Sequence, residues 1–235
     1  MIISKVLIGF ISLVYILFVG FEFFEYSYVA TQISVLIIPL ITLLYFISVK
    51  KKTLFFSLFL ICYSIPELML FVKDAMVYQT YYYICNTLCV AAYVFLLIEI
   101  YRSINFKEVI KRFKVQVIVL AILSSYMGYV LFKIISPSLS LSVEYILEIS
   151  YNILILLVLS VSLLNYFYKD DKKSLFLFLG ALCIVFSEVI NIAYIYIANQ
   201  NLLNFMFVSL FVLAFFFLFQ QSKLEDETEE VLAAG

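Results

Sequence analysis

Two glutamates, Glu67 and Glu188, end two similar segments of this chain and are its best candidates for chemistry. The first segment reads KKTLFFSLFLICYSIPE (residues 51–67) and the second reads KKSLFLFLGALCIVFSE (residues 172–188). Aligned without a gap, the segments share Lys-Lys, Leu, Phe, Leu, Cys and the closing Glu. A carboxyl group inside an apolar membrane helix is costly, so its presence predicts a function by default.

Two carboxyl groups that meet in an apolar environment can divide the roles of acid and base. Placing two negative charges side by side out of water is unfavourable, so such a pair can hold one proton between its members. This arrangement suits general acid–base hydrolysis or proton relay. The alternative is a buried structural pair that shares a proton and does no chemistry.

Other polar residues are expected near the depth of the two glutamates. Glu144, Glu148 and Asn152 follow one another at four-residue spacing, which places them on one helix face. Glu148 and Asn152 are expected either to line a cavity or to bond neighbouring helices. Glu22, Glu25 and Glu144 are expected to lie at the headgroups. The predicted substrate-binding residues are Ser64, Glu148, Asn152, Ser187 and Asn191.

The elements that must position these residues are membrane-spanning helices. The 235 residues are 66% hydrophobic and 13% charged, with mean hydropathy +1.14. Continuous apolar runs of this length predict helices rather than a β-barrel. The sequence therefore predicts an all-α integral membrane protein with one domain over residues 1–222 and an acidic, disordered cytoplasmic tail over 223–235. The eight predicted spans cover residues 4–24, 31–49, 53–72, 77–100, 115–136, 144–167, 174–197 and 202–220.

Charge predicts the orientation of these spans. Of the 15 basic residues, all but Lys73 and Lys133 fall on the side that carries both termini. Basic residues favour the cytoplasmic side, so both termini are predicted to be cytoplasmic. The basic stretch 104–114 is expected to be a cytoplasmic loop near the headgroups. The composition favours a bacterial inner membrane, and the net charge of −1 predicts no nucleic-acid partner.

Metal and cofactor chemistry is not indicated. The four cysteines all fall inside predicted spans, and the chain contains no histidine. We interpret the cysteines as small buried apolar residues. No metal site and no cofactor are predicted.

The similarity between the two glutamate segments predicts a parallel internal repeat of helices 1–4 and 5–8. The same offset of 121 residues also aligns Tyr45 and Phe46 with Tyr166 and Phe167. Each glutamate lies about 22 Å along a helix from its Lys-Lys pair. Both carboxyls are thus expected at one depth, in the outer half of a membrane core roughly 30 Å thick. Sites in repeat proteins of this kind tend to form at the repeat interface.

Three stretches give the chain a family resemblance: IIPLITLLYFISVKKK (37–52), LFFSLFLICYSIPELML (54–70) and GALCIVFSEVINIAYIY (180–196). They resemble the second, third and seventh spans of the YhhN family of membrane lysoplasmalogenases, called transmembrane protein 86 in animals. The resemblance implies hydrolysis of the vinyl ether bond of a lysolipid, with release of a fatty aldehyde. It also implies that Glu67 and Glu188 stand where the family has two catalytic aspartates. A membrane lipid or lysolipid would be the binding partner.

Two alternatives from other functional classes stay open. The chain could be a non-catalytic, lipid-binding or scaffolding subunit that binds another membrane protein. It could also be a proton-coupled transporter, since paired acidic residues in a repeat are compatible with one. Aldehyde release from a lysolipid separates the first interpretation from both alternatives.

Overall fold

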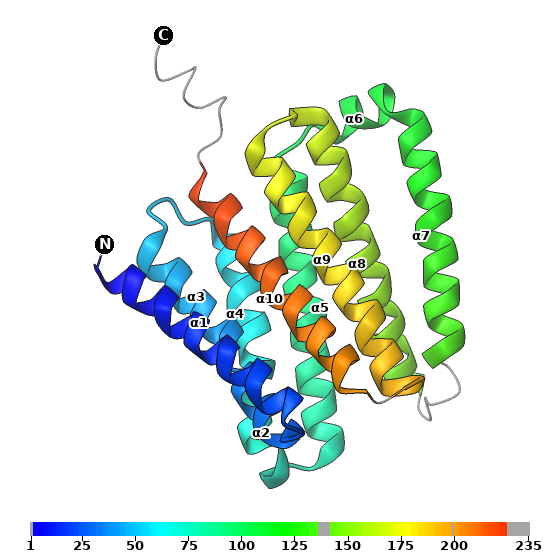
Figure 1. The fold of residues 1–235 in the computed structure, drawn as a ribbon. Coiled ribbons are helices and arrows are strands. Elements are labelled where there is room, and N and C mark those ends of the chain that lie inside the picture. Colours follow the sequence, from blue (N-terminus) through cyan, green and yellow to red (C-terminus); the bar gives the residue numbers. More distant parts are fainter. Residues whose placement is uncertain (1, 136–141, 199, 225–235) are drawn as a thin grey trace.

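The computed structural model describes residues 2–135, 142–198 and 200–224, and every regular element within them is a helix (Figure 1). Most of the helices are long and apolar, as the composition requires. The elements are α1 (Ile2–Phe23), α2 (Ser27–Ser34), α3 (Ile37–Ser48), α4 (Leu54–Met69), the 3-10 helix η1 (Leu70–Ala75), α5 (Tyr78–Arg102), α6 (Phe106–Arg112), α7 (Lys114–Ile135), α8 (Ser142–Lys169), α9 (Lys172–Tyr196) and α10 (Asn201–Lys223).

Eight helical segments in the described residues are long and apolar enough to cross a membrane, which confirms the predicted multi-pass membrane character. Six of them are the single helices α1, α5, α7, α8, α9 and α10. The second joins α2 to α3 and covers Ser27–Ser48, and the third joins α4 to η1 and covers Leu54–Ala75. Most of the predicted acidic tail lies outside the described residues.

The third span changes its helix type beyond Pro66. Proline has no backbone N–H to donate to the carbonyl four residues earlier, here that of Cys62. The α-helix ends at Met69, and η1 carries the chain onward to Ala75. Glu67 therefore lies between a proline and a change of helix type.

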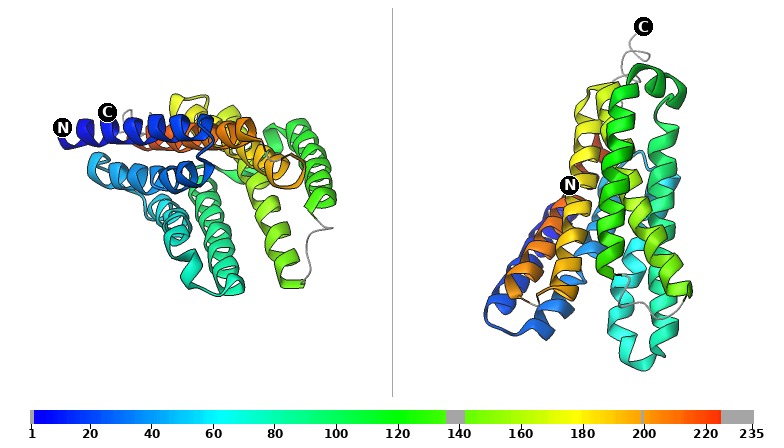
Figure 2. Two further views of the ribbon diagram at one scale, coloured as in Figure 1. Left: turned by 60° about the horizontal axis from the view of Figure 1, so that its bottom comes forward. Right: turned by 90° about the vertical axis from the view of Figure 1, so that its right-hand side faces the viewer.

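The spans pack around a central group formed by α4, α5, α8, α9 and α10. α9 packs most extensively on α10, α4 packs on α5, and α8 contacts both α5 and α9. Figures 1 and 2 show α1 at one edge of the molecule, against α3 and α10, and α7 at the other edge, against α8. Consecutive spans run in alternate directions.

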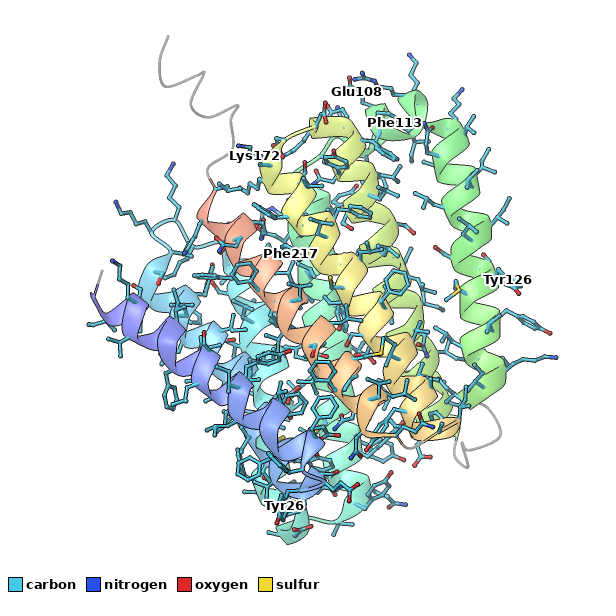
Figure 3. The ribbon with its side chains drawn as sticks, in the orientation of Figure 1. Tyr26, Glu108, Phe113, Tyr126, Lys172 and Phe217 are labelled. Carbon is cyan, nitrogen blue, oxygen red and sulfur yellow. The ribbon has the colours of Figure 1, made fainter. Side chains whose placement is uncertain are left out.

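The turn between α8 and α9 fixes where the second glutamate segment begins. Asp170 adopts a left-handed conformation with φ 53°, and Asp171 then caps α9. The Asp171 carboxylate accepts hydrogen bonds from the Ser174 N–H at 2.7 Å and from the Ser174 hydroxyl at 2.6 Å. This is the usual way to satisfy the free N–H groups of a helix start. Figure 3 shows Lys172 at this turn.

The basic stretch predicted as a loop contains a short helix, α6. Val109 of α6 is fully buried, and Glu108 accepts a 2.9 Å hydrogen bond from the hydroxyl of Tyr168 on α8. The stretch is thus packed onto the ends of the spans. Figure 3 places Glu108 and Phe113 at the same end of the molecule as Lys172, and Tyr26 at the opposite end.

Candidate active site

Glu188 lies in the buried middle of the molecule, on the face of α9 that meets α8. Its side chain is 7% exposed. Carboxylate Oε1 accepts a 2.5 Å hydrogen bond from the hydroxyl of Tyr151 on α8, and the Asn191 side chain gives a second hydrogen bond. The bond from Tyr151 is short, as expected for a hydrogen bond to a charged acceptor. Glu188 is therefore held in one position by two neighbours.

Three tyrosines connect Glu188 to the α4 helix. The ring of Tyr151 meets the ring of Tyr93 edge to face, with centroids 5.5 Å apart, and Tyr93 meets Tyr63 in the same way at 5.7 Å. Tyr93 is fully buried and interacts with both of its tyrosine neighbours, Tyr63 and Tyr151. Tyr63 lies one helical turn before Glu67. The three tyrosines thus form a continuous row of ring contacts that extends from the Glu188 side of the site to α4.

Glu67 occupies a less constrained position than Glu188. Its side chain is partly buried on α4, and it forms no hydrogen bond with any described residue. It interacts electrostatically with Glu188, so the structure brings the two glutamates into one site. It also interacts with Tyr81, Cys85 and Cys89, which lie at four-residue spacing along α5.

Cys89, like Tyr63, interacts electrostatically with both glutamates. Cys89 lies on α5, between the α4 and α9 halves of the site. The sequence assigned it only a packing role. The site therefore draws its residues from α4, α5, α8 and α9.

The serines next to the two glutamates are used in helix packing. Ser64 donates to the Leu60 carbonyl at 2.7 Å, and its hydroxyl oxygen lies 2.7 Å from that of Thr42 on α3. Ser187 donates to the Phe207 carbonyl on α10 at 3.1 Å. Each hydroxyl thus joins its helix to a neighbour. Of the predicted substrate-binding residues, Asn191 is the one that contacts a catalytic candidate directly.

Glu148 and Asn152 lie beside this site and border a separate cavity. Glu148 accepts a 2.9 Å hydrogen bond from the Tyr82 hydroxyl on α5, and it interacts electrostatically with Glu188. The Asn152 amide donates to the Glu148 carbonyl at 2.9 Å, while its own Oδ1 is buried without a partner. Both residues line a cavity of about 530 Å³ between α7 and α8. Both residues thus line a cavity, and Glu148 also joins α8 to α5, whereas the Asn152 amide bonds within its own helix.

The expectation that Glu22 would face the headgroups is wrong. Its side chain is fully buried, and neither carboxylate oxygen has a hydrogen-bond partner among the described residues. The end of α1 is covered because the chain turns back into α2, and because the side chain of Asn201 on α10 donates to the Glu22 carbonyl at 3.3 Å. Glu25 is exposed and Glu144 is partly exposed.

Tyr63, Cys89, Tyr93 and Tyr151 are site residues that the sequence did not single out. Helical spacing could have indicated two of them, since Tyr63 lies four residues before Glu67 and Tyr151 three residues after Glu148. No signal along the chain joins Tyr93 or Cys89 to a glutamate on another helix. Within the described residues, no cluster of three or more His, Cys, Asp and Glu side chains could hold a metal ion.

Comparisons with protein-family models, with curated proteins and with solved structures find no match to this chain. Its function has to be argued from the site itself.

Proposed function

We propose that this protein is an integral-membrane hydrolase that cleaves the vinyl ether bond of a lysolipid by carboxylate acid–base catalysis. The observation that carries the proposal is the electrostatic interaction between Glu67 on α4 and Glu188 on α9, two carboxyl groups among buried residues. Two adjacent carboxyls can supply a proton and a base at the same time. The resemblance to the YhhN family agrees with this chemistry.

The reaction needs one acid, one base and one water molecule. The acid protonates the β-carbon of the vinyl ether, which leaves an oxocarbenium ion on the ether-bearing carbon. The base takes a proton from water as the water oxygen bonds to that carbon, and a hemiacetal results. The hemiacetal hydroxyl proton then passes to the ether oxygen as the carbon–oxygen bond breaks. The products are a fatty aldehyde and a glycerophospho-alcohol, and proton exchange between the carboxyls restores the pair.

The surroundings of the two glutamates favour one division of roles. Hydrogen bonds from Tyr151 and Asn191 stabilise the charged form of Glu188, which suits the base that activates water. Glu67 has no hydrogen bond from a described residue to hold its charge, which suits the proton donor. We therefore assign Glu67 as the acid and Glu188 as the base.

The membrane setting of this hydrolase includes a parallel repeat and cytoplasmic termini. In such a repeat, each contact between two spans should have a counterpart between the two equivalent spans of the other half. The α4–α5 contact corresponds to α9–α10, α3–α4 corresponds to α8–α9, and α5–α8 corresponds to α10–α3. All six contacts are present. The site then lies at the repeat interface. The asymmetry of basic residues favours termini in the cytoplasm, and we place the protein in a bacterial inner membrane.

The direct test is aldehyde release from a lysoplasmalogen by the detergent-solubilised full chain. Glu67→Gln and Glu188→Gln should each reduce the rate by about 100-fold to 10,000-fold, the usual contribution of general acid–base catalysis. Glu99→Gln, which changes a carboxyl at the far end of α5, is the matched control and should keep the rate. The corresponding ester lysolipid should not be cleaved.

Equal turnover by the two Gln variants would overturn the assignment of the pair. Lipid binding without any aldehyde release would favour the non-catalytic lipid-binding subunit instead. Proton movement across vesicles that depends on Glu67 and Glu188, with no hydrolysis, would favour the transporter.

A further inference from the structure

We infer that the cavity between α7 and α8 is a binding groove for a single-chain lysophospholipid that enters from the side of the membrane. The cavity has a volume of about 530 Å³, well within the roughly 300–1,000 Å³ of small-molecule sites. The choice of a lysolipid as the ligand of this groove rests on the proposed function, in which a lysolipid is the substrate. The geometry of the groove does not depend on it.

The walls of the groove suit one hydrocarbon chain. Phe132 and Ile135 of α7 face Ile149, Ile153 and Leu156 of α8 across it. Its α7 wall extends from Ala121 to Ile135, which is about 21 Å of helix and longer than half of a roughly 30 Å membrane core. A chain that spans one leaflet can therefore lie along this wall.

Polar side chains line the groove from both helices, with Ser124 and Ser125 on the α7 side. Glu148 and Asn152 lie on the α8 side, and the Oδ1 of Asn152 is a buried acceptor without a donor. Such an acceptor costs free energy until a ligand donates to it. A glycerol hydroxyl of the lysolipid can donate to Asn152.

The position of α7 leaves the groove open to lipid. Only 11% of the most apolar stretch of α7 is buried, compared with 44% for α9. Figure 1 shows α7 at the edge of the molecule, with α8 as its main neighbour. Figure 3 shows Tyr126 of α7 pointing away from the other helices. A lipid can reach the groove laterally because little protein covers this edge.

Glu148 connects the groove to the two-glutamate site. It lines the groove, bonds Tyr82 of α5 and interacts electrostatically with Glu188. A headgroup held at Glu148 and Asn152 is thus adjacent to the catalytic candidates. The groove is placed to collect lipid for the site.

Photo-crosslinking with a lysophosphatidylcholine that carries a diazirine near the end of its chain tests this inference. The probe is an ester, so it measures binding without the proposed reaction. In the full-length protein in nanodiscs, we expect crosslinks on α7 and α8 at groove residues, mapped by mass spectrometry. Crosslinks spread evenly over all eight spans would overturn the inference.

Gly128→Phe is the variant that blocks the groove. A Cβ at Gly128 meets only the Leu156 Cδ1, at an ordinary 3.8 Å, so the ring can enter the groove without a backbone clash. We expect crosslinking to fall about ten-fold, which corresponds to a loss of about 1.4 kcal/mol of binding free energy. Ile122→Phe, at a residue 64% exposed on the same helix, is the matched control and should change nothing.

Asn152→Leu keeps the side-chain size and removes the acceptor. It should weaken binding of the probe about ten-fold, because the ligand hydroxyl then loses its partner. Unchanged crosslinking in both Gly128→Phe and Asn152→Leu would rule out the groove. If the unmodified protein is crosslinked in the groove but releases no aldehyde, the result would count against the proposed hydrolase and would still support lipid binding in the groove. Thermal unfolding of each variant separates misfolding from a binding defect.

Discussion

Glu67 and Glu188 end the same sequence unit, yet α4 and α9 give them different surroundings. α9 is a regular helix of 25 residues, and Glu188 lies deep within it, bonded by Tyr151 and Asn191. α4 contains Pro66 and gives way to a 3-10 helix three residues after Glu67, which is only partly buried. The Glu188 side of the site is therefore a regular helix whose carboxylate accepts hydrogen bonds. The Glu67 side is an irregular segment in which no described residue bonds the carboxyl.

The aligned positions around the two glutamates explain the difference. Pro66 aligns with Ser187, which bonds α9 to α10, whereas a proline can make no such bond. Phe59 aligns with Gly180, and this substitution sets how closely the next helix can approach. Two similar segments can thus end in the same carboxyl while the neighbours of that carboxyl differ, and such a difference would allow the two carboxyls to take different roles.

The largest effect should come from removing the carboxyls, singly or together. Each single variant, Glu67→Gln or Glu188→Gln, should slow aldehyde release by about 100-fold to 10,000-fold. If the two carboxyls act as one catalytic unit, the double variant will be no slower than the worse single variant. Rates of the four proteins under one substrate concentration provide the measurement. A double variant whose loss equals the product of the two single losses would show that the halves work independently.

A smaller effect should follow from the bond that distinguishes the α9 half. Tyr151→Phe removes the hydroxyl that donates to Glu188, and a hydrogen bond to a charged group contributes about 1.5–3 kcal/mol. We expect aldehyde release to fall about ten-fold to 100-fold, with kcat affected more than KM because Tyr151 acts through Glu188. Tyr63→Phe, on the α4 side, is the matched control. A larger loss with Tyr63→Phe would reverse the proposed contrast between the halves.

The smallest effect concerns packing. A Cβ on Gly180 would lie 2.9 Å from two atoms of Leu218 and 3.2 Å from the Ala214 carbonyl oxygen, so α9 and α10 have no room for a side chain there. Gly180→Val should lower the free energy of unfolding by about 1–3 kcal/mol, the cost of overpacking a core. Gly128→Ala, at the open α7–α8 contact, should not destabilise the protein. Denaturant unfolding in micelles compares the two, and equal stability would contradict the tight packing inferred for the α9 half.

The sequence predicted the spans well because long apolar runs leave few alternatives in a membrane. It could not predict how the second and third spans are divided. Glu67 and Glu188 were predictable as candidates because the similarity of segments 51–67 and 172–188 is visible in the sequence. The bond from Tyr151 to Glu188 was not predictable, since it depends on how α8 is rotated against α9.

Burial of polar groups was the least predictable feature. Glu22 lies near the end of its span, where headgroup contact is the usual outcome, and its burial follows from contacts with α2 and α10. Ser64 and Ser187 fall beside the glutamates in sequence, but their hydroxyls bond to α3 and α10. In each case the deciding neighbour is distant along the chain.

The exposed position of α7 has a consequence for how this protein must be handled. Most of its surface is solvated by annular lipid rather than by protein, so the bilayer supplies a large part of the force that holds it against α8. Extraction into detergent replaces that lipid shell and should loosen α7 before any other span. Its amides would then exchange with solvent deuterium first, as expected of the least supported element of a fold.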